Sequence, residues 1–288
     1  MEPIRLIGLD LDGTLLDSGK HISQATYDAL ARAADMGVHL VPVTGRPHEG
    51  IPKLVRDLPF VEYFISCNGA AIRRKNGDFI RAATIPHERT LEVADILAEC
   101  HEPYEALVLG GGYGEGWVYE AMMAVSPNNQ FLRRYIQETR HIVPDLSAYI
   151  KEKRMEAEEF FVMTASTEGL AEVAENLKKV SGIHVVFPAA HALEVTAEGV
   201  DKGEALLHLA SHLGVPQKSI MALGDSGNDL KMLMAAEVSV AMGNAEEQVK
   251  SLSKFVTDSN DEDGVAKAIS RFVLERAIGK KTVFKFRL

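Results

Sequence analysis

Two aspartates, spaced two residues apart, close the first apolar run of the chain. Asp10 and Asp12 follow the run Ile4–Leu9 and precede Gly13-Thr14. In an extended segment residues i and i+2 point to the same face, so the two carboxylates would crowd each other and call for a cation nearby. The pair therefore predicts a metal and nucleophile site at the carboxyl end of a parallel strand, where such sheets bind ligands. A helix N-cap or an Asp-Gly turn is the alternative.

A second acidic cluster repeats this pattern near the other end of the chain. Gly224-Asp225-Ser226-Gly227-Asn228-Asp229 follows an apolar run at residues 220–223. Magnesium prefers hard oxygen ligands and keeps several waters, so two or three protein oxygens suffice. We expect the carboxylates of Asp10 and Asp225 and the backbone carbonyl of Asp12 to supply them. N-capping of the following helix is the alternative for Asp225 and Asp229.

Two further positions suit a bound phosphate group. Thr44-Gly45 ends an apolar run, and a hydroxyl beside accessible backbone N–H groups fits a phosphate oxygen. Lys202 lies at the expected start of a helix, where the helix dipole disfavours a cation. This misplaced charge singles Lys202 out, with a solvated surface lysine as the alternative.

Bulk composition excludes several classes of protein. The 288 residues are 46% hydrophobic and 25% charged, which is typical of a folded globular chain. A formal net charge of −10 without a basic stripe argues against nucleic acid as a partner. Two cysteines are too few for a disulfide framework, and no apolar run reaches the roughly 20 residues that cross a bilayer. The first strand begins too early for a signal peptide, so we expect a cytoplasmic protein without membrane contact.

The order of the expected elements indicates a two-domain α/β protein. Residues 1–83 and 194–288 alternate strands with helices, for example helices at residues 23–36 and 202–213, while residues 84–193 give a mixed set. This predicts a Rossmann-like, doubly wound, mostly parallel sheet core with an inserted α+β cap. Pro42 should lie on an edge strand or a bulge, and Asn76-Gly77 predicts a hairpin. The glycine-rich run at residues 110–116 lacks nucleotide-loop spacing and is expected to be a hairpin or lid loop. We expect the C-terminal tail, residues 284–288, to pack against the fold, with an added edge strand or a subunit contact as the alternatives.

Taken in this order, the motifs resemble the haloacid dehalogenase (HAD) superfamily. Asp10-Leu11-Asp12-Gly13-Thr14 is similar to its first motif, Thr44 to its second, Lys202 to its third, and Gly224–Asp229 to its fourth. The insert, together with Asn68-Gly69-Ala70 and Gly243-Asn244-Ala245, resembles the Cof-type phosphatase branch, which carries a C2B cap.

The resemblance implies a magnesium-dependent phosphomonoester hydrolase that acts on small phosphorylated metabolites, for which we expect sugar phosphates. Asp10 would attack phosphorus to give an aspartyl-phosphate, and Asp12 would act as acid and then as base. The implied residue sets are Asp10, Asp12 and Asp225 for Mg²⁺, and Leu11, Thr44, Gly45, Lys202 and Asn228 for phosphate. Asp229 would orient its loop or contact the metal.

Two other functions are compatible with the same motifs. A phosphomutase of the superfamily, similar to a phosphomannomutase, would return the phosphate to its substrate, and a non-catalytic sensor would only bind it. We expect a small phosphorylated metabolite as the partner, and a monomer or weak homodimer as the oligomeric state.

Overall fold

The computed structural model describes residues 2–125, 129–164 and 166–275, and it divides into two compact units. Unit 1 combines Met1–Thr44, Lys53–Ile80 and the described part of Asp201–Leu288, and unit 2 combines Gly45–Pro52 with Arg81–Val200. The domain boundaries expected from the sequence stay a prediction, and the tail at residues 284–288 lies outside the described residues. Within the described residues, no helix combines the length and the apolar character needed to span a membrane.

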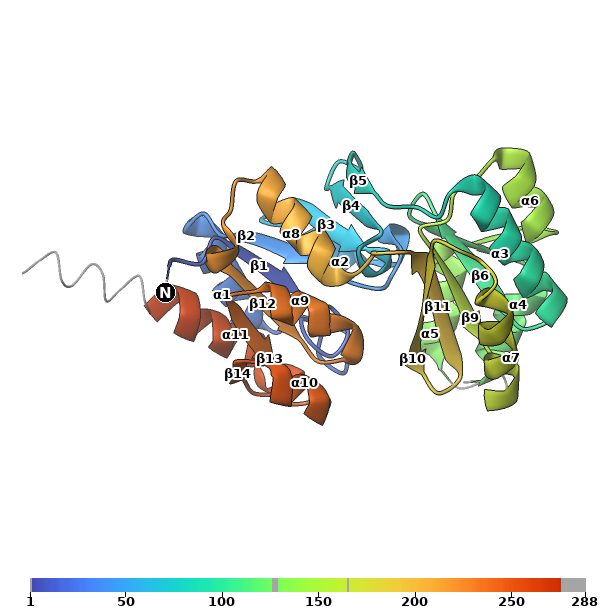
Figure 1. Cartoon of the computed structure of the whole chain (residues 1–288). Helices are drawn as coiled ribbons and strands as arrows, with labels where there is room; N and C mark the ends of the chain where they lie inside the picture. The colour runs from blue at the N-terminus through green and yellow to red at the C-terminus, as the bar shows by residue number, and fades with distance from the viewer. Residues whose placement is uncertain (1, 126–128, 165, 276–288) are drawn as a thin grey trace, which may run out of the picture. The chain divides into compact units, whose positions relative to one another are not determined.

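Unit 1 is built on a five-stranded parallel sheet (Figure 1). Its strands, in spatial order, are β14 (Phe255–Val256), β13 (Val238–Ala241), β12 (Ile220–Gly224), β1 (Leu6–Leu9) and β2 (His39–Pro42). Leu9 lies opposite Leu223 on one side and Pro42 on the other, so the carboxyl ends of three strands meet at one edge. Pro42 ends β2, but isolated parallel bridges from Leu40 to Val61 and from Val43 to Ile65 lie along the other side of this strand, so the edge position expected for this proline is not confirmed.

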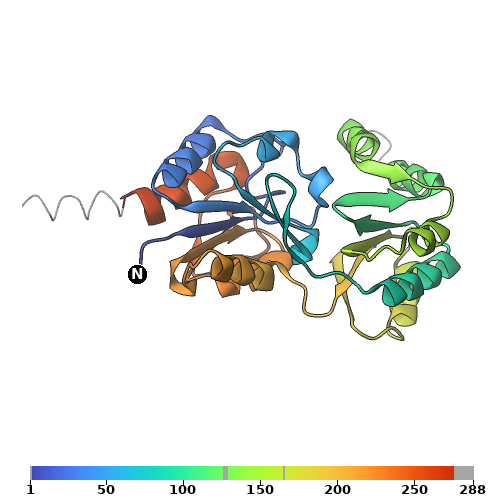
Figure 2. The same ribbon diagram turned by 90° about the horizontal axis from the view of Figure 1, so that it is seen from above.

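Helices cover both faces of this sheet, as Figure 2 shows. One face carries α1 (Gln24–Asp35) and α11 (Gly264–Ile269), and α11 continues into a π-helical turn at Ser270–Leu274. The other face carries α8 (Lys202–His212), α9 (Leu230–Ala235) and α10 (Glu247–Leu252). The short helix α2 (Lys53–Arg56) lies between β2 and β3 in sequence. The expected helix at residues 23–36 is confirmed, because the Ser23 side chain caps α1 and Gly37 follows it with φ +80°. The expected doubly wound fold is thus confirmed.

An antiparallel extension follows the second strand in sequence. It contains β3 (Tyr63–Ser66), β4 (Ala71–Arg74) and β5 (Phe79–Ala82). Gly77, with φ +94°, lies in the turn between β4 and β5, so the hairpin expected from Asn76-Gly77 is present.

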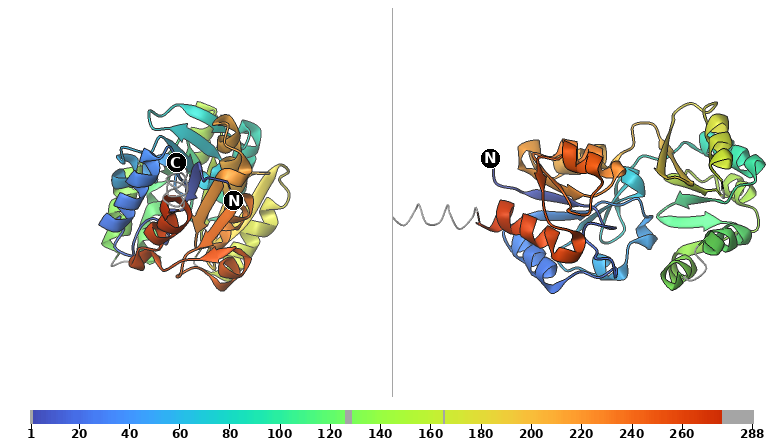
Figure 3. Two further views of the ribbon diagram at one scale, coloured as in Figure 1. Left: turned by 90° about the vertical axis from the view of Figure 1, so that its left-hand side faces the viewer. Right: turned by 90° about the horizontal axis from the view of Figure 1, so that it is seen from below.

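Unit 2 is a six-stranded mixed sheet with helices on both faces, which can be followed in Figure 3. Its strands, in spatial order, are β10 (Ile183–Ala189), β11 (Ala192–Ala197), β9 (Glu159–Met163), β6 (Tyr104–Val108), β7 (Gly111–Gly114) and β8 (Arg140–Ile142). A large apolar core joins one face to α3 (His87–Cys100), α6 (Leu146–Lys153) and α7 (Thr167–Leu177). A smaller cluster joins the other face to α4 (Gly116–Val125) and α5 (Gln130–Thr139). The glycine-rich run forms β7, which pairs with β6 as a hairpin.

Candidate active site

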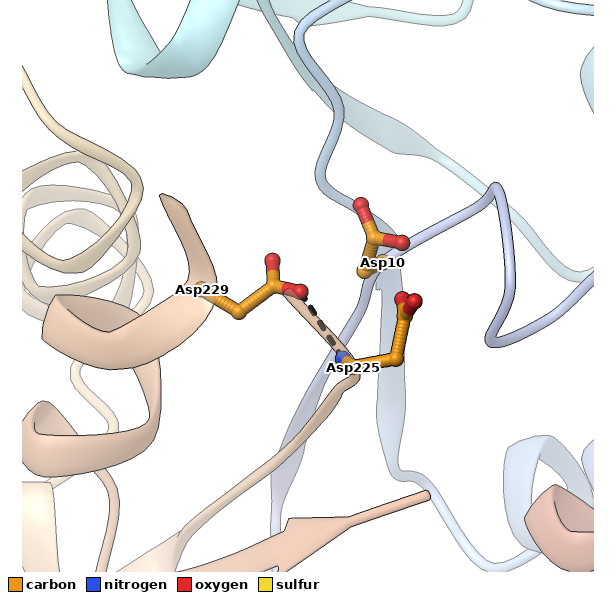
Figure 4. A group of neighbouring side chains, drawn as sticks. All are labelled: Asp10, Asp225 and Asp229. Carbon is orange, nitrogen blue, oxygen red and sulfur yellow. Dashed lines mark hydrogen bonds between the residues drawn. The ribbon is translucent and has the colours of Figure 1, made fainter. Parts of the chain in front are cut away.

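Three aspartates from two loops of unit 1 converge beyond the carboxyl ends of β1 and β12. Oxygens of Asp10, Asp225 and Asp229 all lie within 4.8 Å of one another (Figure 4). Asp10 directly follows β1, and Asp225 directly follows β12, its parallel neighbour. Segments more than 200 residues apart in sequence therefore place their carboxylates together because their strands are adjacent.

Lys202 joins two of these carboxylates. Its Nζ donates to Asp10 Oδ1 at 2.8 Å and to Asp229 Oδ1 at 2.7 Å. The ammonium is 1% exposed, and α8 begins at this residue after its cap, Asp201. The charge that was misplaced relative to the helix dipole is therefore offset by two buried anions.

Asp229 holds the loop that carries Asp225. Its second oxygen, Oδ2, accepts from the backbone N–H groups of Asp225 at 2.9 Å and Ser226 at 3.1 Å, the first of which is drawn in Figure 4. Asp225 in turn accepts from the Thr14 hydroxyl at 3.1 Å. Because both oxygens of Asp229 already accept hydrogen bonds, its geometry favours an orienting role.

The cluster carries more negative charge than its own cation offsets. When ionised, three carboxylates against one ammonium leave a formal charge of −2. Burial, then the charge of Asp229, raises the pKa of Asp10 well above its usual value, although Lys202 opposes this. The same two causes raise the pKa of Asp225 to about 6. Carboxylate oxygens gathered in this way fit a hard divalent cation such as Mg²⁺.

Asp12 has a different environment from Asp10. Its carboxylate accepts from Lys20 Nζ at 2.7 Å and is 38% exposed. β1 ends at Leu9, so Asp12 lies in a turn and the strand alternation that predicted crowding does not apply. Gly13, with φ +85°, completes the turn, and a Cβ there would overlap the Asp225 carboxylate. Asp10 and Asp12 therefore differ in their hydrogen-bond partners and in the exposed fraction of their side chains.

Three of the residues expected to bind phosphate lie on neighbouring loops of unit 1. Thr44 is buried, and its carbonyl accepts from the N–H of Asn68. The Asn68 side chain accepts from Asn228 Nδ2 at 3.1 Å, which links the loops after β3 and β12. The carbonyl of Leu11 accepts from the N–H of Leu16 inside the turn after β1. Of the other two, Lys202 bridges Asp10 and Asp229, and Gly45 belongs to unit 2.

Thr14, Lys20 and Asn68 also contact residues of this site, although no sequence pattern predicted these contacts. Thr14 belongs to the first motif, and the structure places its hydroxyl 3.1 Å from the Asp225 carboxylate. Asn68 follows β3 with φ +51°, a conformation that asparagine adopts more readily than most residues. Lys20 also has a positive φ of 63°, but no sequence pattern pointed to its pairing with Asp12.

Comparison with known proteins decides the family. The family model described as haloacid dehalogenase-like hydrolase matches residues 7–269. The chain belongs to this family. The superfamily expected from the four motifs is therefore confirmed.

Relatives within the family match nearly the whole chain. Phosphatase YwpJ of Bacillus subtilis is 29% identical over 91% of this chain and 98% of its own length. The 5-amino-6-(5-phospho-D-ribitylamino)uracil phosphatase YcsE of the same organism is 29% identical, with coverages of 94% and 96%. The pyridoxal phosphate phosphatase YbhA of Escherichia coli is 28% identical, with coverages of 92% and 97%.

Solved structures of the family agree with the fold. A haloacid dehalogenase-like hydrolase from B. subtilis superposes with a TM-score of 0.81 at 28% identity, covering 94% of this chain and all of that one. A sugar phosphatase of HAD subclass IIB superposes with a TM-score of 0.76 at 26% identity, with coverages of 93% and 98%. Together these relatives support the expected enzyme class, a phosphatase.

Proposed function

We propose that this chain is a Mg²⁺-dependent phosphomonoester hydrolase that acts on small phosphorylated metabolites through an aspartyl-phosphate on Asp10. The names of its relatives support a phosphorylated small molecule as substrate, because they include a pyridoxal phosphate phosphatase and a sugar phosphatase. Within that range we propose sugar phosphates.

The observation that carries this proposal is the bridge from Lys202 to Asp10. The contact holds one oxygen of Asp10 at 2.8 Å from a buried ammonium and fixes the orientation of its carboxylate. A carboxylate held in this way is a competent nucleophile toward phosphorus, since phosphoryl transfer depends mainly on positioning and charge neutralisation.

The proposed reaction has two steps at phosphorus. Asp10 forms a P–O bond while the bond to the leaving oxygen breaks, and Asp12 donates its proton to that oxygen. A water molecule then attacks the aspartyl-phosphate, Asp12 takes a proton from it, and the bond to Asp10 breaks. The partial exposure of Asp12 and its pairing with Lys20 suit a group that must exchange protons with solvent and return to its carboxylate form.

The remaining residues bind and neutralise the phosphoryl group. Leu11, Thr44, Gly45, Lys202 and Asn228 are proposed to contact its oxygens. The carboxylates of Asp10 and Asp225 and the backbone carbonyl of Asp12 would hold Mg²⁺. When bound, the ion supplies two positive charges that offset both the acidic cluster and the substrate.

Replacement of the nucleophile tests this proposal. We expect Asp10→Asn to lower phosphate release by at least about 10⁴-fold, since the amide is a far weaker nucleophile. Asp35→Asn, an exposed change at the end of α1, is the matched control and should keep full activity. Unchanged phosphate release by Asp10→Asn, measured over a panel of phosphate esters, would rule the proposal out. Cytoplasmic location and a monomeric or weakly dimeric state remain predictions.

A further inference from the structure

The loop after β13 contains Gly243-Asn244-Ala245, a motif that no step of the proposed reaction uses. This loop runs from Met242 to Glu246 and joins β13 to α10 within unit 1. β13 pairs in parallel with β12, so the two strands end at the same edge of the sheet. The motif is therefore delivered to the edge that also carries Asp225.

Two backbone hydrogen bonds join this loop to the loop that carries Asp225. The N–H of Met242 donates to the carbonyl of Gly224 at 3.0 Å. The N–H of Glu246 donates to the carbonyl of Asp225, also at 3.0 Å. Since Asp229 accepts from the N–H of Asp225, the peptide groups on both sides of the Asp225 Cα are hydrogen-bonded. The carboxylate of Asp225 thus projects from a backbone that is fixed on both sides.

The side chain of Asn244 reaches the other acidic loop, which is the turn after β1. Its Nδ2 donates to the carbonyl of Gly13 at 2.8 Å. Gly13 directly follows Asp12, and a Cβ on Gly13 would lie 2.4 Å from Asp225 Oδ2. The backbone of Gly13 therefore packs against the Asp225 carboxylate. Asn244 holds the chain at a point where the two acidic loops meet.

Asn260 holds Asn244 in this orientation. Its backbone N–H donates to Asn244 Oδ1 at 3.0 Å, so both ends of the Asn244 amide are hydrogen-bonded. The side chain of Asn260 donates from Nδ2 to the carbonyl of Leu16 at 2.9 Å, further along the turn after β1. An amide side chain suits this place because it offers a donor to the Gly13 carbonyl and an acceptor to an N–H at the same time.

The residue after Asn260 adds a third attachment of this turn. The carboxylate of Asp261 accepts from the N–H of Ser18 at 2.8 Å and from its hydroxyl at 2.6 Å. Residues 10–23 contain turns and single bridges rather than a helix or a strand, so their position depends on contacts of this kind. The loops after β13 and β14 therefore anchor the turn after β1.

We propose that Asn244 is a positioning residue for the metal site and that Asn260 supports it. Asn244 holds the carbonyl of Gly13 and thereby fixes the backbone of the adjacent Asp12, whose carbonyl is proposed to bind Mg²⁺. This role rests on the proposed function, which supplies the metal. Groups that orient a metal ligand contribute to metal affinity, whereas a purely structural asparagine would contribute only to stability.

Titration calorimetry with MgCl₂ as the only ligand tests this role without turnover. We expect Asn244→Ala to weaken Mg²⁺ binding by about three- to tenfold, which is the effect of losing one hydrogen bond in a folded protein. Gln248→Ala, an exposed change on α10, is the matched control and should bind Mg²⁺ as tightly as the unmodified protein. Equal Mg²⁺ affinities for Asn244→Ala and the unmodified protein would overturn the proposal.

Asn260→Ala provides a second, milder variant. It removes the bond to Leu16 but keeps the backbone N–H that faces Asn244, so we expect Mg²⁺ binding to weaken by only about two- to threefold. If thermal unfolding shows that Asn244→Ala does not fold, Asn260→Ala decides the question, and an unchanged Mg²⁺ affinity would then overturn the proposal. An unchanged affinity beside a loss in Asn244→Ala would overturn the role of Asn260 alone.

Phosphate release measured against Mg²⁺ concentration separates this role from the proposed function. In Asn244→Ala, the Mg²⁺ concentration for half-maximal release should rise by the factor found in calorimetry, while kcat at saturating Mg²⁺ stays within about twofold. A lower kcat with an unchanged half-maximal concentration would show a structural role and overturn the proposal. If the unmodified protein hydrolyses no phosphate ester, the proposed function fails, while the Mg²⁺ affinities still decide the role of Asn244.

Discussion

Unit 1 and unit 2 both bury carboxylates, but they compensate them to different degrees. In unit 1, one ammonium serves Asp10 and Asp229 while Asp225 lies beside them, so the formal charge is −2. In unit 2, Arg140 of β8 donates from Nε and one terminal nitrogen to the two oxygens of the buried Glu105 of β6, each at 2.7 Å. The first arrangement fits a divalent cation, whereas in the second Arg140 compensates Glu105 within the protein itself. Charge compensation thus distinguishes the two groups of buried carboxylates.

Metal removal should affect the first region most. We expect chelation to lower activity by at least about 10³-fold and added Mg²⁺ to restore it, because a metal supplies several kcal/mol of charge stabilisation. Phosphate release measured with chelator and after Mg²⁺ addition checks this. Glu194→Gln, a change on β11 of unit 2, should retain the same dependence on Mg²⁺. If activity persists in the presence of chelator, the acidic cluster of unit 1 does not need a metal, and the two regions do not differ in this way.

Replacement of Lys202, whose ammonium is shared by Asp10 and Asp229, tests the charge compensation in unit 1 through the free energy of unfolding. Lys202→Met leaves two buried carboxylates without their cation, and we expect it to lower the free energy of unfolding by about 3–5 kcal/mol. Addition of Asp229→Asn should recover part of this loss, because one uncompensated charge is then removed. Denaturant unfolding of the single and double variants measures both effects.

The control for that experiment is a lysine of the same unit at the surface. Lys231 is 62% exposed and pairs with Asp201 at 3.1 Å, so Lys231→Met should cost less than about 1 kcal/mol. If Lys202→Met and Lys231→Met have equal effects on unfolding, the buried bridge does not compensate the cluster as described.

A smaller effect is expected at Gly112, which makes room for the Arg140–Glu105 ion pair of unit 2. Gly112→Ala would force Arg140 away from Glu105, and we expect a loss of about 1–3 kcal/mol in the free energy of unfolding, as in other overpacked sites. Gly116→Ala is the matched control, since its nearest neighbour would lie 3.8 Å from the new Cβ. Equal unfolding midpoints for the two variants would show that the Arg140–Glu105 pair tolerates displacement.

The two regions also differ in how far the sequence predicts them. In unit 1, acidic residues follow apolar strand runs, so Asp10 and Asp225 and the start of α8 at Lys202 could be located from patterns alone. The same reasoning placed the helix after Ser23 and the hairpin at Asn76-Gly77. It failed for the geometry of Asp12, because the strand ends at Leu9 and the chain then turns.

In unit 2, the buried glutamates have no local sequence signature. Glu105, Glu159 and Glu194 stand in three strands whose order in the sheet cannot be deduced from their sequence alone. Alternation within each strand puts each glutamate on the face opposite its apolar neighbours, which is ordinarily the solvent face. Glu105 is buried together with Arg140 of β8, so its charge compensation depends on tertiary structure.

The most direct test of the central claim is a search for the phosphoryl group on Asp10. In an Asp12→Asn variant, p-nitrophenyl phosphate has a leaving group that needs no proton, so the first step should proceed, whereas the second step lacks its base. Acid quenching with Mg²⁺ present, followed by peptide mass spectrometry, should find one added phosphoryl group on the peptide that contains Asp10. A phosphoryl group on another residue, or continued phosphate release with Asp10 unmodified, would contradict the account.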